Sequence, residues 1–563
     1  MKRKNTIPVL IHSVLIILVL IFDAGLFWYT RPVQRIGRLV DAGQKYLLDN
    51  DYKDALVLFR KAILIDKKSV PAQLGVGKSA FLIAKDTSDL STKEKYFDEA
   101  RDAYSTVMSI ERDNEEALSA MDDLYVEWSN VYIDAGDYDK AQQLLSEAED
   151  VSSSESNDVK SQISKVETLV AEEKKKEEEN KQRAQAYADT ITKTLDDYFS
   201  NGTYDYVKDM SSMKTAQQFA VMDVDGDGHD ELIIAINDAS VVSMAGMIGW
   251  IFDYDLATNQ VREEMSEFPY ITIYENGTIE EAYSHNQGII VGSMGAYTLY
   301  RYNSTKDVYE AIYDANSWSK EFLPDDNDEI HFPDEIDQDG DGEIYIITTL
   351  ENNQESDVDN AQYFQWHNQQ VNNTNPVHIN YYYCTPENIE SLRNQTLGQP
   401  LANTEPAPYL DALKSVAVNS NLFNNGINLD LSSGQCFDQG DYYEVKNVKL
   451  TVPTIYSSRE DAVAAAGSNS SDYVAQINEH QWKALRQDYT PYETTLYQGS
   501  IFVRKDAQIG CGIYENLIYA HYVLNVDDFQ NIIRDQSHYD GNCYIQSFDA
   551  NGYITSLDAK YQY

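Results

Sequence analysis

An acidic motif near the middle of the 563-residue chain has the residue types and spacing of a metal site. Asp223, Asp225 and Asp227 alternate with other residues, glycines follow the second and third of them, and Glu231 comes eight residues after the first. Calcium is a hard cation that takes about 6–8 oxygen ligands. Alternating carboxylates in a curled loop can surround such an ion, and glycine lets the backbone curl. We therefore predict a calcium site formed by these four side chains, with His229 contributing its backbone carbonyl.

The spacing distinguishes between two kinds of calcium loop. An EF-hand starts in the same way but needs a glutamate at position twelve and flanking helices. Position twelve is Ile234, in an apolar run that reads as a strand. The segment instead resembles the FG-GAP/VCBS calcium loop of β-propeller blades and the DxDGDGxxEL loops of bacterial surface proteins. This resemblance implies side-chain ligands at the first, third, fifth and ninth positions, from Asp223, Asp225, Asp227 and Glu231. An acidic turn without metal is the alternative.

A second loop of this kind follows about 114 residues later. Aspartates occupy its first, third and fifth positions: Asp337, Asp339 and Asp341. The ninth position is Tyr345, which departs from the pattern, and we expect Glu343 or Asp334 to compensate. The sequence predicts a second cation site with a less complete ligand set. Two loops so far apart do not fit consecutive propeller blades, so we expect an irregular β-rich domain over residues 200–397.

The composition limits the classes of partner. The chain has 92 acidic and 44 basic residues and a formal net charge of -48, and most of the acidic excess lies beyond residue 200. Such a surface repels polyanions, which excludes a nucleic-acid binder of the usual basic kind. The apolar fraction of 42% suffices for several packed domains and excludes global disorder.

The N-terminus reads as a membrane anchor. Residues 7–26 are almost all apolar, which at about 1.5 Å per helical residue matches a bilayer core. Basic residues precede this run, and Trp28 and Tyr29 follow it. We expect residues 1–30 to form a cytoplasmic tip and a signal anchor, crossing the cell membrane once through residues 7–29, with the bulk of the chain extracytoplasmic. A cleaved signal peptide is the alternative.

Residues 36–150 carry an internal repeat. Small and aromatic residues recur in the first copy at helical spacing: Gly43, Tyr46, Tyr52, Ala55, Phe59 and Ala62. The segments LDNDYKDAL and IDAGDYDKAQ look like the same inter-helix turn. This pattern resembles the tetratricopeptide repeat (TPR), a helix–turn–helix unit of about 34 residues. We expect three copies, with an insertion over residues 85–95. The resemblance implies a protein or peptide partner; a spacer or a self-association unit is the alternative.

Two further segments follow from charge and alternation. Residues 156–199 read as a long polar helix, and a coiled coil is its sharper alternative. Residues 409–563 read as an α+β domain with helices over 409–423 and 459–486 and alternating strands elsewhere. The many tyrosines of this region can form a glycan- or peptide-binding face, but ordinary half-buried sheet residues are the favoured interpretation.

Neither the cysteines nor any motif indicates catalysis. Four cysteines lie in the C-terminal part, without CxxC spacing, and are either free or paired in two disulfides: Cys384, Cys436, Cys511 and Cys543. The sequence contains no GxSxG, HExxH, P-loop or GxGxxG motif. A non-enzyme is therefore favoured.

These features define a multidomain fold class. It consists of an N-terminal transmembrane helix, an all-α TPR solenoid, a long polar helix and a β-rich to α+β extracytoplasmic region. The combination resembles membrane-anchored surface proteins of Gram-positive bacteria. We expect a protein-binding or scaffold module with structural calcium loops. The alternative is a surface hydrolase that acts on carbohydrate through a carboxylate pair in the C-terminal half.

Overall fold

The protein is described from a computed structural model that covers most of the chain. The described residues are 31–151, 157–200, 210–237, 247–282, 296–320, 331–416, 427–467, 474–478, 481–486, 491–515, 518–525 and 539–561. The chain divides into two compact units, Met1–Glu178 and Glu179–Tyr563. Residues 200–397 and 409–563, predicted as separate domains, both fall within the second unit, which we call unit 2.

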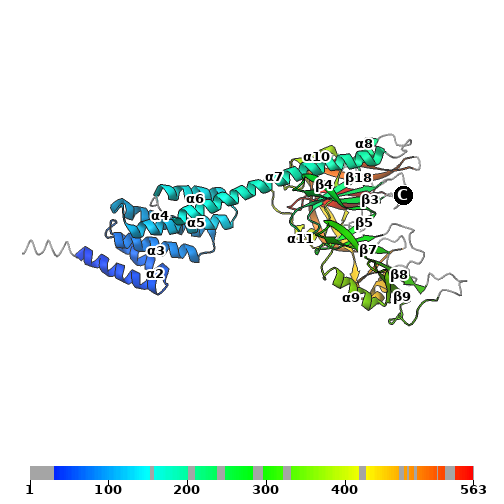
Figure 1. Cartoon of the computed structure of the whole chain (residues 1–563), viewed down its shortest axis with the longest axis horizontal. Helices are drawn as coiled ribbons and strands as arrows, with labels where there is room; N and C mark the ends of the chain where they lie inside the picture. The colour runs from blue at the N-terminus through cyan, green and yellow to red at the C-terminus, as the bar shows by residue number, and fades with distance from the viewer. Residues whose placement is uncertain are drawn as a thin grey trace, which may run out of the picture. The chain divides into compact units, whose positions relative to one another are not determined.

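Unit 1 is a stack of antiparallel helices (Figure 1). A first helix covers residues 31–48. The helices that follow it are α2 (Tyr52–Ile63), α3 (Val70–Asp86), α4 (Leu90–Ile110), α5 (Glu115–Asp134) and α6 (Tyr138–Val151), and the division between the units falls inside α7 (Asn157–Ser200). Each consecutive pair is a helical hairpin that cannot bury its apolar face alone, so neighbouring hairpins stack on it.

Glycines allow the close contacts between these helices. A Cβ atom added at Gly43 would lie 2.7 Å from the ring of Phe59, and one at Gly75 would lie 2.3 Å from the same ring. A Cβ atom at Gly77 would lie 2.4 Å from the ring of Tyr104. Small residues therefore lie where aromatic side chains of the neighbouring helix pack, as the TPR pattern predicts. The N-terminal helices form a TPR-like stack.

The two turns that look alike in sequence share a backbone conformation. Asn50 and Gly136 occupy the same turn position and both have positive φ, 59° and 72°. The following aspartates, Asp51 and Asp137, each accept a hydrogen bond from the backbone N–H three residues further on, at 3.4 and 3.2 Å. Both aspartates thus cap the helix that follows.

The insertion predicted over residues 85–95 is largely helical. Because α3 extends to Asp86 and α4 begins at Leu90, three residues separate the two helices. Asp89 accepts a hydrogen bond from the backbone N–H of Thr92 at 2.8 Å, which starts α4. The extra residues lengthen the second hairpin instead of forming a loop.

The structure corrects the prediction of a transmembrane helix and of a single-pass membrane location. Among the described residues, none of the helices combines the length and the apolar character needed to cross a membrane. The longest, α7, has 44 residues but is charged on all sides between Glu172 and Arg183. Residues 7–29, on which the prediction was placed, lie outside the described residues. The fold class is thus a helical stack followed by a large β-rich region.

The described residues of unit 2 form four β-sheets. The five-stranded sheet has the order β11-β1-β2-β3-β4 and the six-stranded sheet β10-β9-β8-β7-β6-β5. Their strands are β1 (Gln218–Met222), β2 (Glu231–Asn237), β3 (Met247–Asp255), β4 (Gln260–Phe268), β5 (Tyr270–Ile273), β6 (Ile279–Ala282), β7 (Tyr297–Asn303), β8 (Val308–Ser319), β9 (Glu343–Thr349), β10 (Gln354–Val358) and β11 (Tyr382–Tyr383). All their pairings are antiparallel.

These two sheets are the inner layers of an α–β–β–α arrangement. One core joins the C-terminal half of α7 to the outer face of the five-stranded sheet, for example Tyr187 to Leu232. A second core lies between the sheets, where Ile233 and Tyr309 belong to the same cluster. A third joins the six-stranded sheet to α9 (Asn360–Gln370). The short helices α8 (Met210–Thr215) and α10 (Pro386–Arg393) complete this half.

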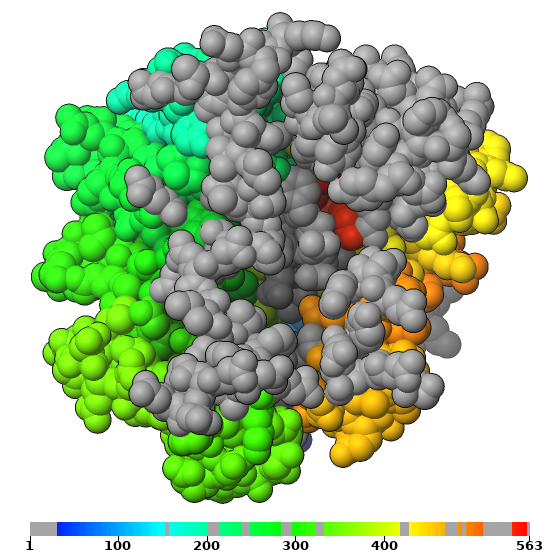
Figure 2. Space-filling view, turned by 90° about the vertical axis from the view of Figure 1, so that its right-hand side faces the viewer, coloured from blue at the N-terminus to red at the C-terminus, as the bar shows by residue number. Residues whose placement is uncertain are grey.

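The C-terminal half is built around a seven-stranded sheet of order β13-β14-β12-β20-β21-β18-β19, in which an added pairing of β14 with β18 closes a ring of strands. A three-stranded sheet, β15-β17-β16, lies beside α12. The elements are α11 (Leu410–Lys414), β12 (Asn428–Asp430), β13 (Gln435–Asp438), β14 (Tyr442–Pro453), β15 (Ile455–Tyr456), α12 (Arg459–Ala466), β16 (Val474–Asn478), β17 (Gln481–Ala484), β18 (Glu493–Glu515), β19 (Ile518–Asn525), β20 (Tyr539–Phe548) and β21 (Ile554–Tyr561). On the face in Figure 2, the residues of the first half are green and those of the C-terminal half run from yellow to red.

Two predictions for this half are wrong. The helix expected over residues 459–486 ends at Ala466, because Gly467 takes a positive φ of 96°, and the chain then forms β16 and β17. The alternative with two disulfides is also wrong, since it needs all four cysteines and none of the three whose side chains are described forms a disulfide: Cys384, Cys436 and Cys543.

Candidate metal centre

The first carboxylate loop joins two strands of the five-stranded sheet. β1 and β2 are antiparallel, and Met222 at the end of β1 pairs with Glu231 at the start of β2. Asp223 is therefore the first residue after β1, and the loop returns to the sheet at the ninth position of the motif. Both ends of the ligand set are thus anchored to paired strands.

Hydrogen bonds within the loop hold its backbone in a curl. Asp223 accepts from the N–H groups of Gly226 and Gly228, at 2.7 and 3.1 Å. Both glycines have positive φ, 83° and 88°, a conformation that favours glycine. The carboxylate of Asp225 accepts from the N–H of Asp227 at 3.0 Å. These hydrogen bonds therefore hold the carboxylate oxygens of Asp223 and Asp225 inside the turn.

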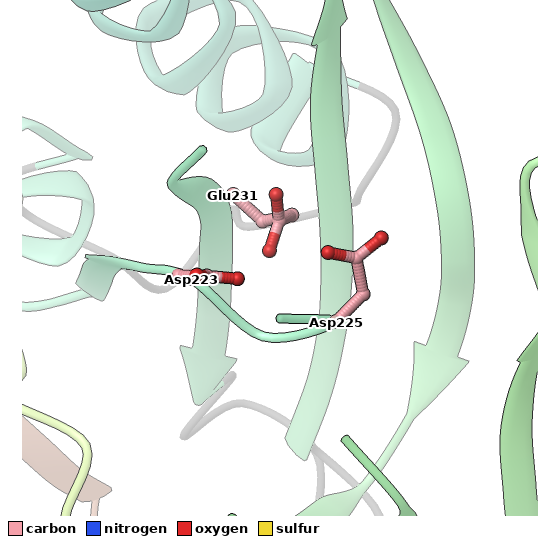
Figure 3. Close-up of side chains that lie close together, drawn as sticks. All are labelled: Asp223, Asp225 and Glu231. Atoms are coloured by element: carbon pink, nitrogen blue, oxygen red, sulfur yellow. The ribbon is translucent and has the colours of Figure 1, made fainter. Parts of the chain in front are cut away.

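Three of the predicted ligands converge. Asp223, Asp225 and Glu231 each offer a carboxylate oxygen, and these oxygens lie within 4.8 Å of one another (Figure 3). Asp227 does not belong to this group; its Oδ1 accepts from the N–H of His229 at 2.7 Å. The carbonyl role of His229 stays a prediction.

Glu231 is the least solvated member of the group. Its side chain belongs to a residue that is 2% exposed, and its Oε2 accepts a hydrogen bond from the N–H of Val224 at 2.6 Å. Burial raises the pKa of Glu231 to about 9, with smaller contributions from the charges of Asp225 and Glu264. A cation held by this carboxylate would remove the cost of burying its charge.

A further acid next to the loop could not be found from sequence. Glu264 of β4 is 5% exposed, and its Oε2 has no hydrogen-bond partner among the described residues. Burial, with smaller contributions from the negative charges of Asp253 and Asp225, raises the pKa of Glu264 to about 8. The register of β3 and β4 shifts between Ile251 and Phe252, and this irregularity makes Glu264 the extra residue of β4. The alternation of the VREEMSEF segment gives no signal of such a shift.

The second loop repeats the hydrogen bonds of the first. Asp337 accepts from the N–H groups of Gly340 and Gly342 at 2.8 and 3.0 Å, and Asp339 accepts from the N–H of Asp341 at 3.1 Å. The two glycines again have positive φ, 73° and 79°. The carboxylates of Asp337, Asp339 and Asp341 offer oxygens within 4.8 Å of one another.

The residues expected to complete the second loop behave differently. Glu343 is at the position of His229 in the first loop, and its N–H likewise donates to Asp341 Oδ1, at 2.8 Å. Asp334, whose side chain is 70% exposed, forms an ion pair with Lys320 at 2.5 Å. Asp334 is thus engaged by a lysine and is not part of the aspartate group.

An all-oxygen set of this kind suits one class of metal ion. Carboxylates select hard cations such as calcium, magnesium and manganese, whereas zinc sites usually include histidine or cysteine. The ring of His229 is not part of the group of converging ligand atoms, which consists of carboxylate oxygens alone. The three converging carboxylates of each loop could hold such a cation, with backbone carbonyls and water completing its coordination.

Comparisons with known proteins add little to this geometry. No protein-family model matches the chain, and no curated protein matches it in sequence. Among solved structures, the chain is similar to a thermophilic TPR protein from Thermus thermophilus, at 14% identity and a TM-score of 0.18, over 28% of this chain and 78% of that chain. A TM-score this low does not establish a shared fold. Unit 1 is described as TPR-like because of the packing between its own helices. The FG-GAP/VCBS resemblance stays a prediction.

Proposed function

We propose that this chain is a protein-binding scaffold. The TPR-like stack of unit 1 takes a protein or peptide partner, and calcium stabilises the β-rich unit 2. The helical stack itself supports the binding role most strongly. In this stack Gly43, Gly75 and Gly77 let neighbouring helices approach closely. Repeat stacks of this kind present extended surfaces that commonly bind proteins.

The calcium part of the proposal is supported by electrostatics. The loop gathers Asp223, Asp225 and Glu231, and Glu231 and Glu264 are almost fully buried beside it. Carboxylates this close repel one another strongly when ionised, and buried ones also lose their hydration. A divalent cation would offset both costs. The same hydrogen-bond pattern occurs in the second loop, and this repetition supports a common metal-binding role for the two loops.

The alternative of a carbohydrate hydrolase rests on composition. No observation among the described residues favours it, and none favours a glycan ligand, so neither is carried into the proposal.

A comparative pulldown tests the binding role. The full chain, Gly77→Leu, Gly37→Ala and Asp225→Asn are used as baits for proteins from the source cells. A Cβ atom at Gly77 would meet the ring of Tyr104, so Gly77→Leu should disrupt the stack, whereas a Cβ atom at Gly37 meets nothing within 4 Å. We expect a partner that is lost with Gly77→Leu and retained by the other two variants. A partner lost with Asp225→Asn alone would contradict the assignment of binding to unit 1.

A further inference from the structure

The second loop lacks a carboxylate at its ninth position. In the first loop this position is Glu231, whose oxygen lies within 4.8 Å of those of two aspartates. In the second it is Tyr345, a fully buried residue whose ring stacks on Tyr363 with a centroid distance of 4.3 Å. Tyr345 is therefore part of the core between the six-stranded sheet and α9.

Strand pairing brings another acid to this end of the sheet. β9 begins directly after the loop, and β10 runs antiparallel to it, with its last residue, Val358, paired with Tyr345. The chain continues from Val358 toward the loop end of β9, and the next residue is Asp359. Asp359 thus follows the strand that neighbours the ninth position of the loop.

The side chain of Asp359 is buried and lacks the bond that its position normally provides. The residue is 5% exposed, and its Oδ1 has no hydrogen-bond partner among the described residues. It occupies the N-cap of α9, where an aspartate usually accepts a hydrogen bond from the first turn, yet it makes no such bond. A buried carboxylate oxygen left in this state is costly unless a cation or a donor pairs with it.

The end of β10 brings Asp359 to the loop, although its oxygens do not belong to the group of three carboxylate oxygens that lie within 4.8 Å of one another. Asp334, the other nearby acid in sequence, is held in its ion pair with Lys320. Asp359 is therefore the buried acid available to the second loop.

We propose that Asp359 supplies the fourth carboxylate of a second calcium site, together with Asp337, Asp339 and Asp341. The loop provides three ligands from one turn, and the N-cap of α9 replaces the missing ninth-position glutamate from a different element. A bound ion would then connect the loop before β9 to the start of α9. This inference rests on calcium being the cation of the first loop, as proposed above.

Calcium stoichiometry of the full chain, measured by equilibrium dialysis and calorimetric titration, tests the proposal. The wild type should bind two ions, Asp359→Asn should bind one or weaken one site at least about tenfold, and Asp225→Asn should lose the other site. The matched control is Asp357→Asn, because Asp357 is an exposed acid two residues earlier on β10. Asparagine caps a helix as well as aspartate does, so Asp359→Asn should fold.

Binding at the first loop in Asp359→Asn reports that unit 2 remains folded, and circular dichroism provides a second check. Two unchanged sites in Asp359→Asn would overturn the proposal. A wild type that binds one ion, lost with Asp225→Asn, would also overturn it but would leave the proposed function standing. No calcium binding to the wild type would remove both.

Discussion

Glu231 combines three properties that seldom occur together in a stable side chain. It is 2% exposed, it starts a central strand, and its oxygen lies within 4.8 Å of those of two aspartates. The N–H of Val224 donates a hydrogen bond to Glu231 Oε2. This bond leaves the negative charge of the carboxylate to be balanced. In our account calcium balances it, so the residue has opposite effects on the calcium-free and calcium-bound states.

Glu231→Gln tests this at the residue scale. Glutamine keeps the size of the side chain and an acceptor for the Val224 N–H but removes the charge. The calcium-free protein should melt at an equal or higher temperature than the wild type, and the rise in melting temperature on adding calcium should fall by more than half. A large loss of stability without calcium, with an unchanged calcium effect, would count against Glu231 as a ligand.

His378 makes a separate contribution that depends on pH. Its ring stacks on Phe548 at 5.4 Å, and burial lowers the pKa of His378 from 6.5 to about 4. The unfolded chain therefore binds a proton between these values that the folded chain excludes, so the contribution of His378 to stability falls as pH is lowered from 6.5 to 4.

We expect His378→Phe to reduce this loss. The melting temperature of the wild type, minus that of the variant, should decrease by a few degrees between pH 7 and pH 4. The difference isolates His378 from buried acids with raised pKa values, such as Glu264 and Asp558, which titrate in the opposite sense. A difference that does not change with pH would contradict the assignment.

At the scale of elements, contacts between helices set the stability of unit 1. A Cβ atom at Gly77 would lie 2.4 Å from Tyr104, whereas one at Gly37 would meet nothing within 4 Å. Gly77→Ala should therefore lower the stability of unit 1 by about 1–3 kcal/mol through overpacking. Gly37→Ala should raise it by up to about 1 kcal/mol, because alanine favours a helix. Denaturant unfolding followed by far-ultraviolet circular dichroism measures both, and equal effects would contradict the packing described.

The helical stack could be predicted because its signals are local. The turn at Asn50 and the turn at Gly136 use the same left-handed position, and spacing alone relates Gly43 to Phe59. The early end of α12 has a local signal, because Gly467 is followed by serines and an asparagine, and the prediction of one helix over residues 459–486 overlooked it. The strands that follow could not be predicted, because they depend on pairing within the sheet β15-β17-β16. Boundaries set by tertiary pairing leave little trace in the sequence.

The candidate site shows the same limit. The converging acids Asp223, Asp225 and Glu231 could be found from spacing, since they lie in one loop. Glu264 and Asp359 could not, because an irregular strand and a strand end bring them near the loops from elsewhere in the chain. Ligands that come from a different element require the sheet register to be known.

At the scale of the whole molecule, the two units should respond differently to calcium. The ion would connect the ends of β1 and β2, and it has no proposed ligand in unit 1. Hydrogen exchange should therefore slow in the segments 218–237 and 337–349 when calcium is added, with little change in α2–α6. Protection confined to unit 1 would place the calcium effect elsewhere.

The central claim is that the first loop binds calcium. Its most direct test is the thermal melting of the full chain in excess calcium and in chelator, for the wild type, Asp225→Asn and Asp441→Asn, where Asp441 is an exposed control acid. We predict that calcium raises the melting temperature of the wild type and of Asp441→Asn by several degrees and that Asp225→Asn loses most of this rise. Equal melting temperatures of the wild type with and without calcium would contradict the account.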